Sequence, residues 1–201
     1  MIVQEKKKFE NQDFSNQNLS FNHFIDCHFI HCKFVSTELY EMKTERCIFD
    51  QCDLSNSKMN SSKHKNTAFL TCIFDGANLF VSTFDNCKMT GSSFLESNLG
   101  GISIIGGDWS FTLLRHQSFK RSQLNEVRFC EADLYQCDFE GANLRNADLS
   151  YADLSGVNFR KADLRGAKLV GTDLKSLDLK GTRIDLSQAV QLAKSHGAII
   201  E

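Results

Sequence analysis

Large apolar residues recur at every fifth position along almost the whole chain. From Phe9 to Ile184 this series has 36 positions without an insertion, and 34 of them are Phe, Leu, Ile, Met or Trp. The two exceptions are Thr44 and His64. A period of five fits neither an α-helix nor a continuous strand, whose side chains alternate every second residue. The pattern therefore indicates short straight segments that are separated by regular corners.

A second series, of small residues, lies two positions before each large residue. From Cys27 to Thr182 it has 32 members, and 28 of them are Ala, Cys, Ser, Thr, Val or Gly. The four exceptions are Met42, Ile102, Gln117 and Leu177. Residues two apart point to the same side of a strand. Each pentad therefore places a small and a large side chain inward, with a polar side chain outward between them.

The number of sides follows from a longer period of twenty residues, which relates, for example, Phe9, Phe29, Phe49 and Phe69. Four pentads per turn predict a square coil, and 36 pentads predict nine turns. With about 4.8 Å between stacked strands, the rod would be roughly 43 Å long. The predicted fold is an all-β solenoid, a quadrilateral β-helix of about nine coils.

The chain is expected to have three parts: a charged lead-in at 1–8, the solenoid at 9–184, and a terminal helix with a short tail at 185–201. Asp185 is suited to cap the helix, because Gln188 follows three residues later, and Gly197 would end it. One face of this helix is apolar, formed by Leu186, Ala189, Val190 and Ala193.

Composition narrows the function classes. The 23 Lys and Arg against 25 Asp and Glu give a net charge of −2, which excludes a basic nucleic-acid binder of the usual kind. No apolar stretch reaches the 18 residues of a membrane span, and no apolar run follows the Lys-rich first ten residues as in a secretory signal. The expected location is the cytoplasm, where the eight Cys would be reduced thiols.

The segment from Cys27 to Cys32 contains two Cys and two His, which are residue types that bind metals, but the repeat argues against a metal site. Both thiols fall in the inward small series, whereas His28 points outward and His31 lies at a corner. Seven of the eight Cys occupy that series, so packing is the expected role, and Cys130 alone lies outside it. No metal or other cofactor is predicted.

The segment from Gly100 to Trp109 is rich in Gly but lacks the Lys-Ser/Thr of a phosphate-binding loop. The repeat runs through it, since Ile104 and Trp109 both occupy large inward positions. We expect a local distortion of the coil around the Trp. A filled solenoid offers no substrate cleft and the sequence no catalytic constellation, so an enzyme is not predicted.

Several pentads resemble the A(D/N)LXX motif of pentapeptide-repeat proteins: Ala142-Asn143-Leu144, Ala147-Asp148-Leu149, Ala152-Asp153-Leu154 and Ala162-Asp163-Leu164. The resemblance extends over 9–184 and implies a right-handed coil. The tail from Asp185 to Gly197 resembles the fluoroquinolone-resistance type, the Qnr family, and above all its loopless mycobacterial-type members (MfpA). Proteins of that type bind DNA gyrase and topoisomerase IV, and they resemble duplex DNA in size, shape and charge. Typical Gram-negative Qnr proteins carry two loops, and the unbroken frame of this chain departs from them.

What the resemblance implies is a non-catalytic DNA mimic that binds type II topoisomerases and protects them from quinolones or related poisons, without binding nucleic acid or membrane itself. The alternative is a structural pentapeptide-repeat scaffold for an unrelated protein partner. Relatives form a homodimer through the C-terminus, which implies an interface here of Leu186, Ala189, Val190, Ala193, Ile199 and Ile200.

The candidate topoisomerase-binding face consists of outward aspartates in the C-terminal half: Asp133, Asp138, Asp148, Asp153, Asp163, Asp173 and Asp178. Asp and Asn also suit this position structurally, because their short side chains hydrogen-bond nearby backbone. Nearby Lys and Arg balance these carboxylates, so mimicry would require the charges to segregate by face. On composition, the structural preference is favoured over an acidic stripe.

Thr44 and His64 are twenty residues apart, beside a cluster of lysines, and define a candidate irregular patch of Lys43, Thr44, Lys63, His64 and Lys65. One outcome is a neutral, inward imidazole hydrogen-bonded near Thr44. The other is a bulge that turns the side chain outward, into a basic patch that could replace the contact of a loop in the relatives. The lack of any apolar residue in 61–66 favours the bulge.

Overall fold

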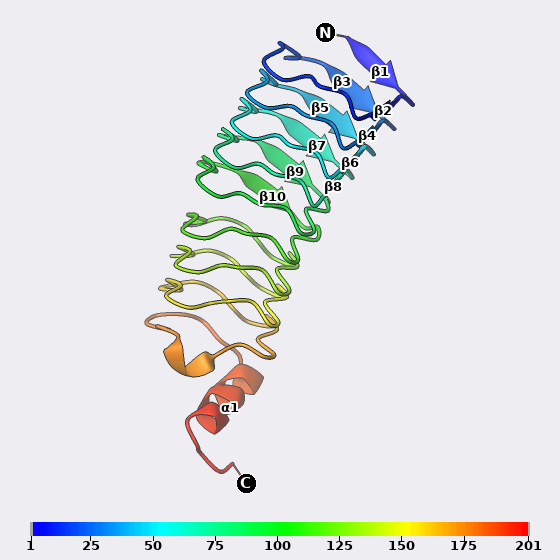
Figure 1. The fold of residues 1–201 in the computed structure, drawn as a ribbon. Helices are drawn as coiled ribbons and strands as arrows, with labels where there is room; N and C mark the ends of the chain where they lie inside the picture. The colour runs from blue at the N-terminus through cyan, green and yellow to red at the C-terminus, as the bar shows by residue number, and fades with distance from the viewer. Residues whose placement is uncertain (1, 201) are drawn as a thin grey trace.

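Residues twenty apart in the sequence lie side by side in the computed structural model, which describes residues 2–200 (Figure 1). Met1 and Glu201, the ends of the expected lead-in and tail, lie outside the described residues. The chain winds into a right-handed, four-sided coil that forms a rod. The lead-in already takes part, because Val3–Glu5 pairs in parallel with His23–Ile25.

Ten three-residue strands form two parallel sheets on adjacent sides of the rod. The first sheet has the order β1-β3-β5-β7-β9-β10 and the second the order β2-β4-β6-β8. The strands of the first sheet are β1 Val3–Glu5, β3 His23–Ile25, β5 Lys43–Glu45, β7 Lys63–Lys65, β9 Thr83–Asp85 and β10 Ser103–Ile105. Those of the second are β2 Lys8–Glu10, β4 His28–Ile30, β6 Ile48–Asp50 and β8 Ala68–Leu70.

Strand content distinguishes the two halves of the rod. Regular strands cover about five turns, ending with β10, rather than the nine equivalent turns that the repeat predicts. Beyond them the twenty-residue spacing continues through isolated parallel bridges, as far as Asp163 with Arg183. The repeat length is therefore uniform, but only the N-terminal half is regular enough to form extended sheets.

The four sides are named by the residues at their centres. The first side is centred on residue 4 and every twentieth residue after it, the second on residue 9, the third on residue 14 and the fourth on residue 19. Large side chains of the five-residue series fill the interior, where Phe29 and Phe49 stack with ring centroids 4.4 Å apart. The inward positions predicted from the sequence are confirmed, including buried Ile104 and Trp109.

The corners explain the absence of proline. The corner residue of most pentads has a positive φ, for example 51° at Asn11 and 59° at Asn16. Proline is fixed near −65° and cannot adopt this conformation. At Gly107, a position of the small series where φ is +93°, a Cβ would lie 2.3 Å from the Cys87 carbonyl oxygen, so this position requires glycine.

The C-terminal end departs from the regular coil. A single 3₁₀ turn, η1 (Leu174–Ser176), is followed by about half a turn of the coil and by the helix α1 (Leu186–Ser195). The predicted cap is confirmed, because Asp185 accepts a hydrogen bond from the Gln188 N–H and Gln188 reciprocates. Within residues 2–200, no helix has both the length and the apolar character needed to cross a membrane.

Candidate functional site

The third side carries an excess of negative charge. Six carboxylates and three cations occupy its outward positions: Asp13, Asp53, Asp75, Asp133, Asp153 and Asp173 against Lys33, Arg115 and Lys175. Acids and bases are equal in number on the second and fourth sides, four of each, and nearly equal on the first. Charge therefore segregates partly by side, and we call the third side the acidic side.

The seven aspartates predicted as one binding face are distributed over all four sides. Asp133, Asp153 and Asp173 lie on the acidic side, where Asp133 and Asp153 are bridged neighbours. Asp138 and Asp178 lie on the fourth side, Asp148 on the second and Asp163 on the first. No more than three of the seven, the first three, lie on one side of the coil.

Local backbone bonds explain why Asp recurs at this position. The Oδ1 of Asp153 accepts a hydrogen bond of 3.0 Å from the Ser155 N–H, two residues on, and the Oδ1 of Asp148 accepts one of 3.1 Å from the Ser150 N–H. The same bond forms at Asp133, Asp138 and Asp163. These carboxylates stabilise the turn of each pentad, which agrees with the structural preference inferred from the sequence.

Most of these carboxylates also face a cation. Arg115 pairs with Asp133, and the other pairs are Lys120–Asp138, Lys168–Asp148, Arg160–Asp178 and Arg165–Asp163. The hydrogen bond from Arg165 lowers the pKa of Asp163 to about 2. Among residues 2–200, Asp153 and Asp173 have no ion pair within 4 Å. On the acidic side they share this with Asp13, Asp53 and Asp75, so Asp133 alone of its six carboxylates has an ion pair within the described residues.

The expected bulge at His64 is wrong, and the inward alternative is correct. Thr44 and His64 are central residues of the regular strands β5 and β7, and both are buried. The His64 ring bonds to the Thr44 hydroxyl at 2.8 Å and the Ser62 hydroxyl at 2.9 Å. Burial lowers the pKa of His64 to about 3, so the imidazole is neutral at physiological pH. Thr44 of the large series and Ser62 of the small series supply hydrogen bonds in place of the apolar contacts that the sequence lacks here.

The lysines of the candidate patch remain on the surface. Lys43, Lys63 and Lys65 are exposed on the first side and border a shallow hollow of about 290 Å³ together with Glu45 and Asp85. The patch is therefore regular in backbone and mixed in charge.

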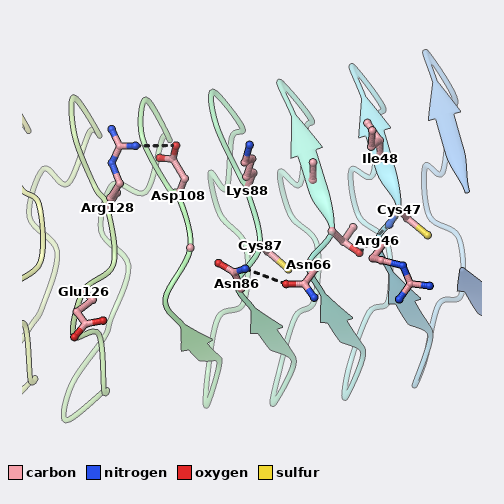
Figure 2. Close-up of a pocket in the computed structure, with 13 residues that line it drawn as sticks. Arg46, Cys47, Ile48, Asn66, Asn86, Cys87, Lys88, Asp108, Glu126 and Arg128 are labelled. Carbon is pink, nitrogen blue, oxygen red and sulfur yellow. Dashed lines mark hydrogen bonds and ion pairs between the residues drawn. The ribbon is translucent and has the colours of Figure 1, made fainter. Parts of the chain in front are cut away.

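The largest hollow is a groove of about 660 Å³ along the corner between the first and second sides (Figure 2). Its charged groups are largely paired, as with Arg128 and Asp108 at 3.6 Å, and Asn86 donates a hydrogen bond of 2.9 Å to Asn66. The groove is open, has a mixed polar and apolar lining, and lacks a converging set of reactive groups among the described residues.

Two thiols beside this groove illustrate the state of the buried cysteines. The Cys47 Sγ donates to the Phe24 carbonyl, and the Cys87 Sγ donates to the His64 carbonyl. Burial raises the pKa of Cys47 to about 11 and that of Cys87 to about 12, the opposite of the shift that a nucleophile needs. All seven Cys of the small series are buried, as predicted, and Cys130 is half-buried.

The C-terminal helix caps the coil through a residue that the apolar pattern did not single out. The Gln188 Nε2 donates to the carbonyls of Leu164, at 2.6 Å, and Ala167, at 2.8 Å. The predicted interface residues Ala189, Val190 and Ala193 are half-buried, whereas Leu186, Ile199 and Ile200 are 81%, 90% and 44% exposed. In the sequence, only the position of Gln188, three residues after the N-cap Asp185, pointed to a capping role for this residue.

Comparison with known proteins identifies the repeat. Two family models match, Pentapeptide repeats over 110–187 and Pentapeptide repeat region over 22–99. Full-length QnrB1, a plasmid-mediated fluoroquinolone resistance protein, superposes with a TM-score of 0.87 at 18% identity, over 98% of this chain and 100% of that one. A trypsin-treated QnrB1 variant gives the same TM-score at 19% identity, over 99% of this chain and 100% of that one.

A more distant solved structure is HetL from the cyanobacterium Nostoc, a pentapeptide-repeat protein involved in the regulation of heterocyst differentiation. Its TM-score is 0.51 at 23% identity, over 90% of this chain and 86% of that one. No curated protein sequence matches significantly. At these identities the likeness establishes the fold.

Proposed function

Because the chain belongs to the pentapeptide-repeat family, we propose that it is a non-catalytic binding protein that occupies the DNA-binding surface of a type II topoisomerase, DNA gyrase or topoisomerase IV. There it would protect the enzyme from quinolones or related poisons. It would act in the cytoplasm, where these enzymes act on DNA.

The observation that carries this proposal is the full-length likeness to QnrB1, a fluoroquinolone resistance protein. The 98% of this chain that superposes must include part of the terminal helix as well as the coil, so the likeness extends beyond the repeat. HetL shares the repeat but superposes at only 0.51. The proportions of the rod, rather than the pentapeptide repeat alone, favour the resistance type.

The acidic side is the surface that we propose for the contact. Duplex DNA presents a negative charge for about every 1.7 Å of its axis, and proteins bind it with cationic surfaces. Here Asp133 and Asp153 stack at the spacing of one turn, about 4.8 Å, and Asp173 follows in the next turn. Because this charge density is lower than that of DNA, binding should weaken with salt less steeply than DNA binding does.

We further propose that two copies associate through their C-termini. Leu186 at the start of α1, and Ile199 and Ile200 after its end, are exposed apolar side chains that association would remove from water. A dimer of this kind would double the length of the rod.

A second candidate is a scaffold for an unrelated protein partner. The charge balance on the second and fourth sides favours it, because those sides carry no field that would attract a cationic surface. In that case the acidic side would be dispensable for function.

Supercoiling by DNA gyrase in the presence of ciprofloxacin tests the proposal. Added wild-type protein should restore supercoiling that the drug inhibits. The double variant Asp133→Asn and Asp153→Asn keeps the Oδ1 acceptors of both turns but removes the charges, and it should protect several-fold less well. A matched control is Asp138→Asn with Asp178→Asn on the fourth side, which should protect like wild type. If wild-type protein gives no protection, the topoisomerase proposal fails; if both double variants protect equally, the acidic side is the wrong surface.

A further inference from the structure

The hydrogen bonds between successive turns are interrupted in the middle of the rod, well before the irregular turn that contains η1. In the preceding turn, the Asn98 N–H donates to the Ala77 carbonyl and the Val81 N–H to the Gly100 carbonyl, both at 2.9 Å. The equivalent amides of the next interval, Ser118 and Gly101, have no hydrogen-bond partner in the described part of the chain. Seven amides are affected in total: Glu96, Leu99, Gly101, Ile104, Gly106, Ser118 and Gln123.

The interruption affects the fourth and first sides only. The first sheet ends at β10, and bridging on that side resumes between Gln123 and Asn143. On the third and second sides the ladder continues without a break, through the bridges of Ser93 with Leu113 and Asp108 with Arg128. Two adjacent turns are therefore joined along one half of the coil and separated along the other half.

Gln117 accounts for the separation. It occupies a slot of the small series and is 9% exposed. Its Nε2 donates to the Phe94 carbonyl at 3.1 Å and the Ser97 carbonyl at 3.2 Å. Equivalent small residues reach only the first of these carbonyls, as when Ser97 Oγ donates to Phe74 O. The longer amide also takes the Ser97 oxygen, which the Ser118 N–H would otherwise use.

The end of the coil uses the same arrangement. There the Gln188 amide donates to two carbonyls three residues apart, those of Leu164 and Ala167. The Gln117 amide likewise donates to the carbonyls of Phe94 and Ser97. It therefore ends the hydrogen-bond ladder of the preceding turns at this point, as Gln188 ends the ladder of the whole coil. Behind Gln117, however, lies another turn of coil instead of a covering helix. The result is an internal sheet edge with open groups on both walls.

A cleft follows this edge immediately beyond β10. Three hollows of about 450, 400 and 210 Å³ succeed one another along it. The first two share Ser97 as a lining residue, and the last two share Ile102 and Ser122. Gly100, Gly101 and Gly106 lie on its wall, so no side chain covers the backbone there. The main-chain groups of the edge are thus accessible along its length.

We propose that this cleft binds an extended segment of a partner polypeptide by main-chain pairing. An unpaired strand edge is a template for another strand, which supplies N–H and C=O groups in alternation. The walls offer both kinds of group, since the carbonyls of Ser118, Lys120 and Ile102 would in a regular coil accept from Leu99, Gly101 and Gln123. A polyanion would satisfy only the donors, so a polypeptide fits the edge better. The proposal does not depend on the topoisomerase function.

Amide NMR of the full chain tests the proposal with a defined probe. The probe is a synthetic ten-residue peptide that copies residues 117–126 with Gln117→Ser. In a regular coil this segment would pair with the preceding turn, which here forms one open wall of the cleft. The amides of Leu99, Gly101, Ser118 and Gln123 should shift on titration, whereas Asn98 and Asn143 should not.

The matched variant of the protein is Gln117→Ser, which restores the residue type found at Ser57 and Ser97 in the same slot. It should close the cleft and weaken the peptide at least tenfold. The control is Met42→Ser, also an oversized member of the small series, but one whose ladder is intact, with Lys63 N–H donating to the Met42 carbonyl at 2.8 Å. It should bind like wild type.

Hydrogen exchange without peptide provides an independent readout. The seven open amides should exchange faster in wild type than in Gln117→Ser. Fast exchange with no peptide-induced shift up to millimolar concentration would mean that the interruption is only a flexible joint, and would overturn the proposal. Equal binding by Gln117→Ser and wild type would overturn it as well.

Discussion

Acidification should destabilise this protein through one imidazole, that of His64. The ring is enclosed between Thr44 and Ser62 and stacks on Phe84 with centroids 4.8 Å apart. No carboxylate is hydrogen-bonded to it within the described residues, so nothing compensates the charge of an imidazolium there. Burial consequently lowers the pKa of His64 from 6.5 to about 3.

The sign and size of the effect follow from proton linkage. Above pH 6.5 the imidazole is neutral in both the folded and the unfolded chain, and the full stability is present. As the pH falls below 6.5 the unfolded chain binds a proton that the folded chain excludes, and stability is lost until about pH 3. At 1.36 kcal/mol per pKa unit the complete loss is about 5 kcal/mol, of which about 2 kcal/mol falls between pH 6.5 and 5.

Urea unfolding at pH 7.5 and pH 5, compared between wild type and His64→Phe, measures this effect. Phe suits the site because Phe24 and Phe84 fill the same series, and the Thr44 and Ser62 hydroxyls keep their bonds to Thr67 and Ser82. Wild type should lose about 2 kcal/mol more than the variant on acidification. Equal losses in the two proteins would refute the reasoning, as would an NMR titration of the His64 ring near pH 6.

Three further outcomes are expected. Phe74→Ala removes a fully buried ring and should lower the free energy of unfolding by about 3–5 kcal/mol, and a loss below about 1 kcal/mol would contradict the packing described. Thiol titration of the native protein should find Cys130 fast and the seven buried Cys slow, whereas eight fast thiols would contradict the inward assignment. Truncation after Ile184 uncaps the Leu164 and Ala167 carbonyls and should give a monomer or an aggregate in sedimentation; a monomeric full-length chain at micromolar concentration would exclude the dimer.

The repeat itself was predictable because one physical constraint acts at every pentad. Each pentad must bury a small and a large side chain, so Phe29, Cys52 and Leu144 could be placed inward from their position in the repeat alone. The corners were predictable as corners, but their positive φ was not inferred, although the absence of proline is its consequence.

The candidate sites were less predictable because they depend on contacts between side chains twenty residues apart. Sequence spacing places Asp133 beside Asp153, but it does not show that Arg115 pairs with Asp133 from the preceding turn. The error at His64 had a similar origin. A run without apolar residues favoured a bulge, whereas Ser62 and Thr44 supply enough buried hydrogen bonds to keep the strand regular.

The exceptions in the small series carry the information about where the coil is irregular. Leu177 ends the 3₁₀ turn η1, and both Ile102 and Gln117 line the interrupted interval, whereas Met42 leaves the ladder intact. A large side chain in the small series therefore does not by itself separate two turns. A side-chain amide that donates to a second backbone carbonyl, as in Gln117, does separate them.

This distinction predicts the effect of a glutamine placed elsewhere in the same slot. Ser57 is buried, and its hydroxyl has no hydrogen-bond partner within residues 2–200, so Ser57→Gln breaks no side-chain bond. The new amide should take the Thr37 carbonyl from the Lys58 N–H, a bond of 2.9 Å, and also free the Leu39 N–H from the Lys58 carbonyl. Hydrogen exchange at Lys58 and Leu39 should accelerate by at least tenfold, while Ser57→Thr, which lacks the reach, should leave both amides protected. Unchanged exchange in Ser57→Gln would show that the glycines of the central turn, and not Gln117, open the coil.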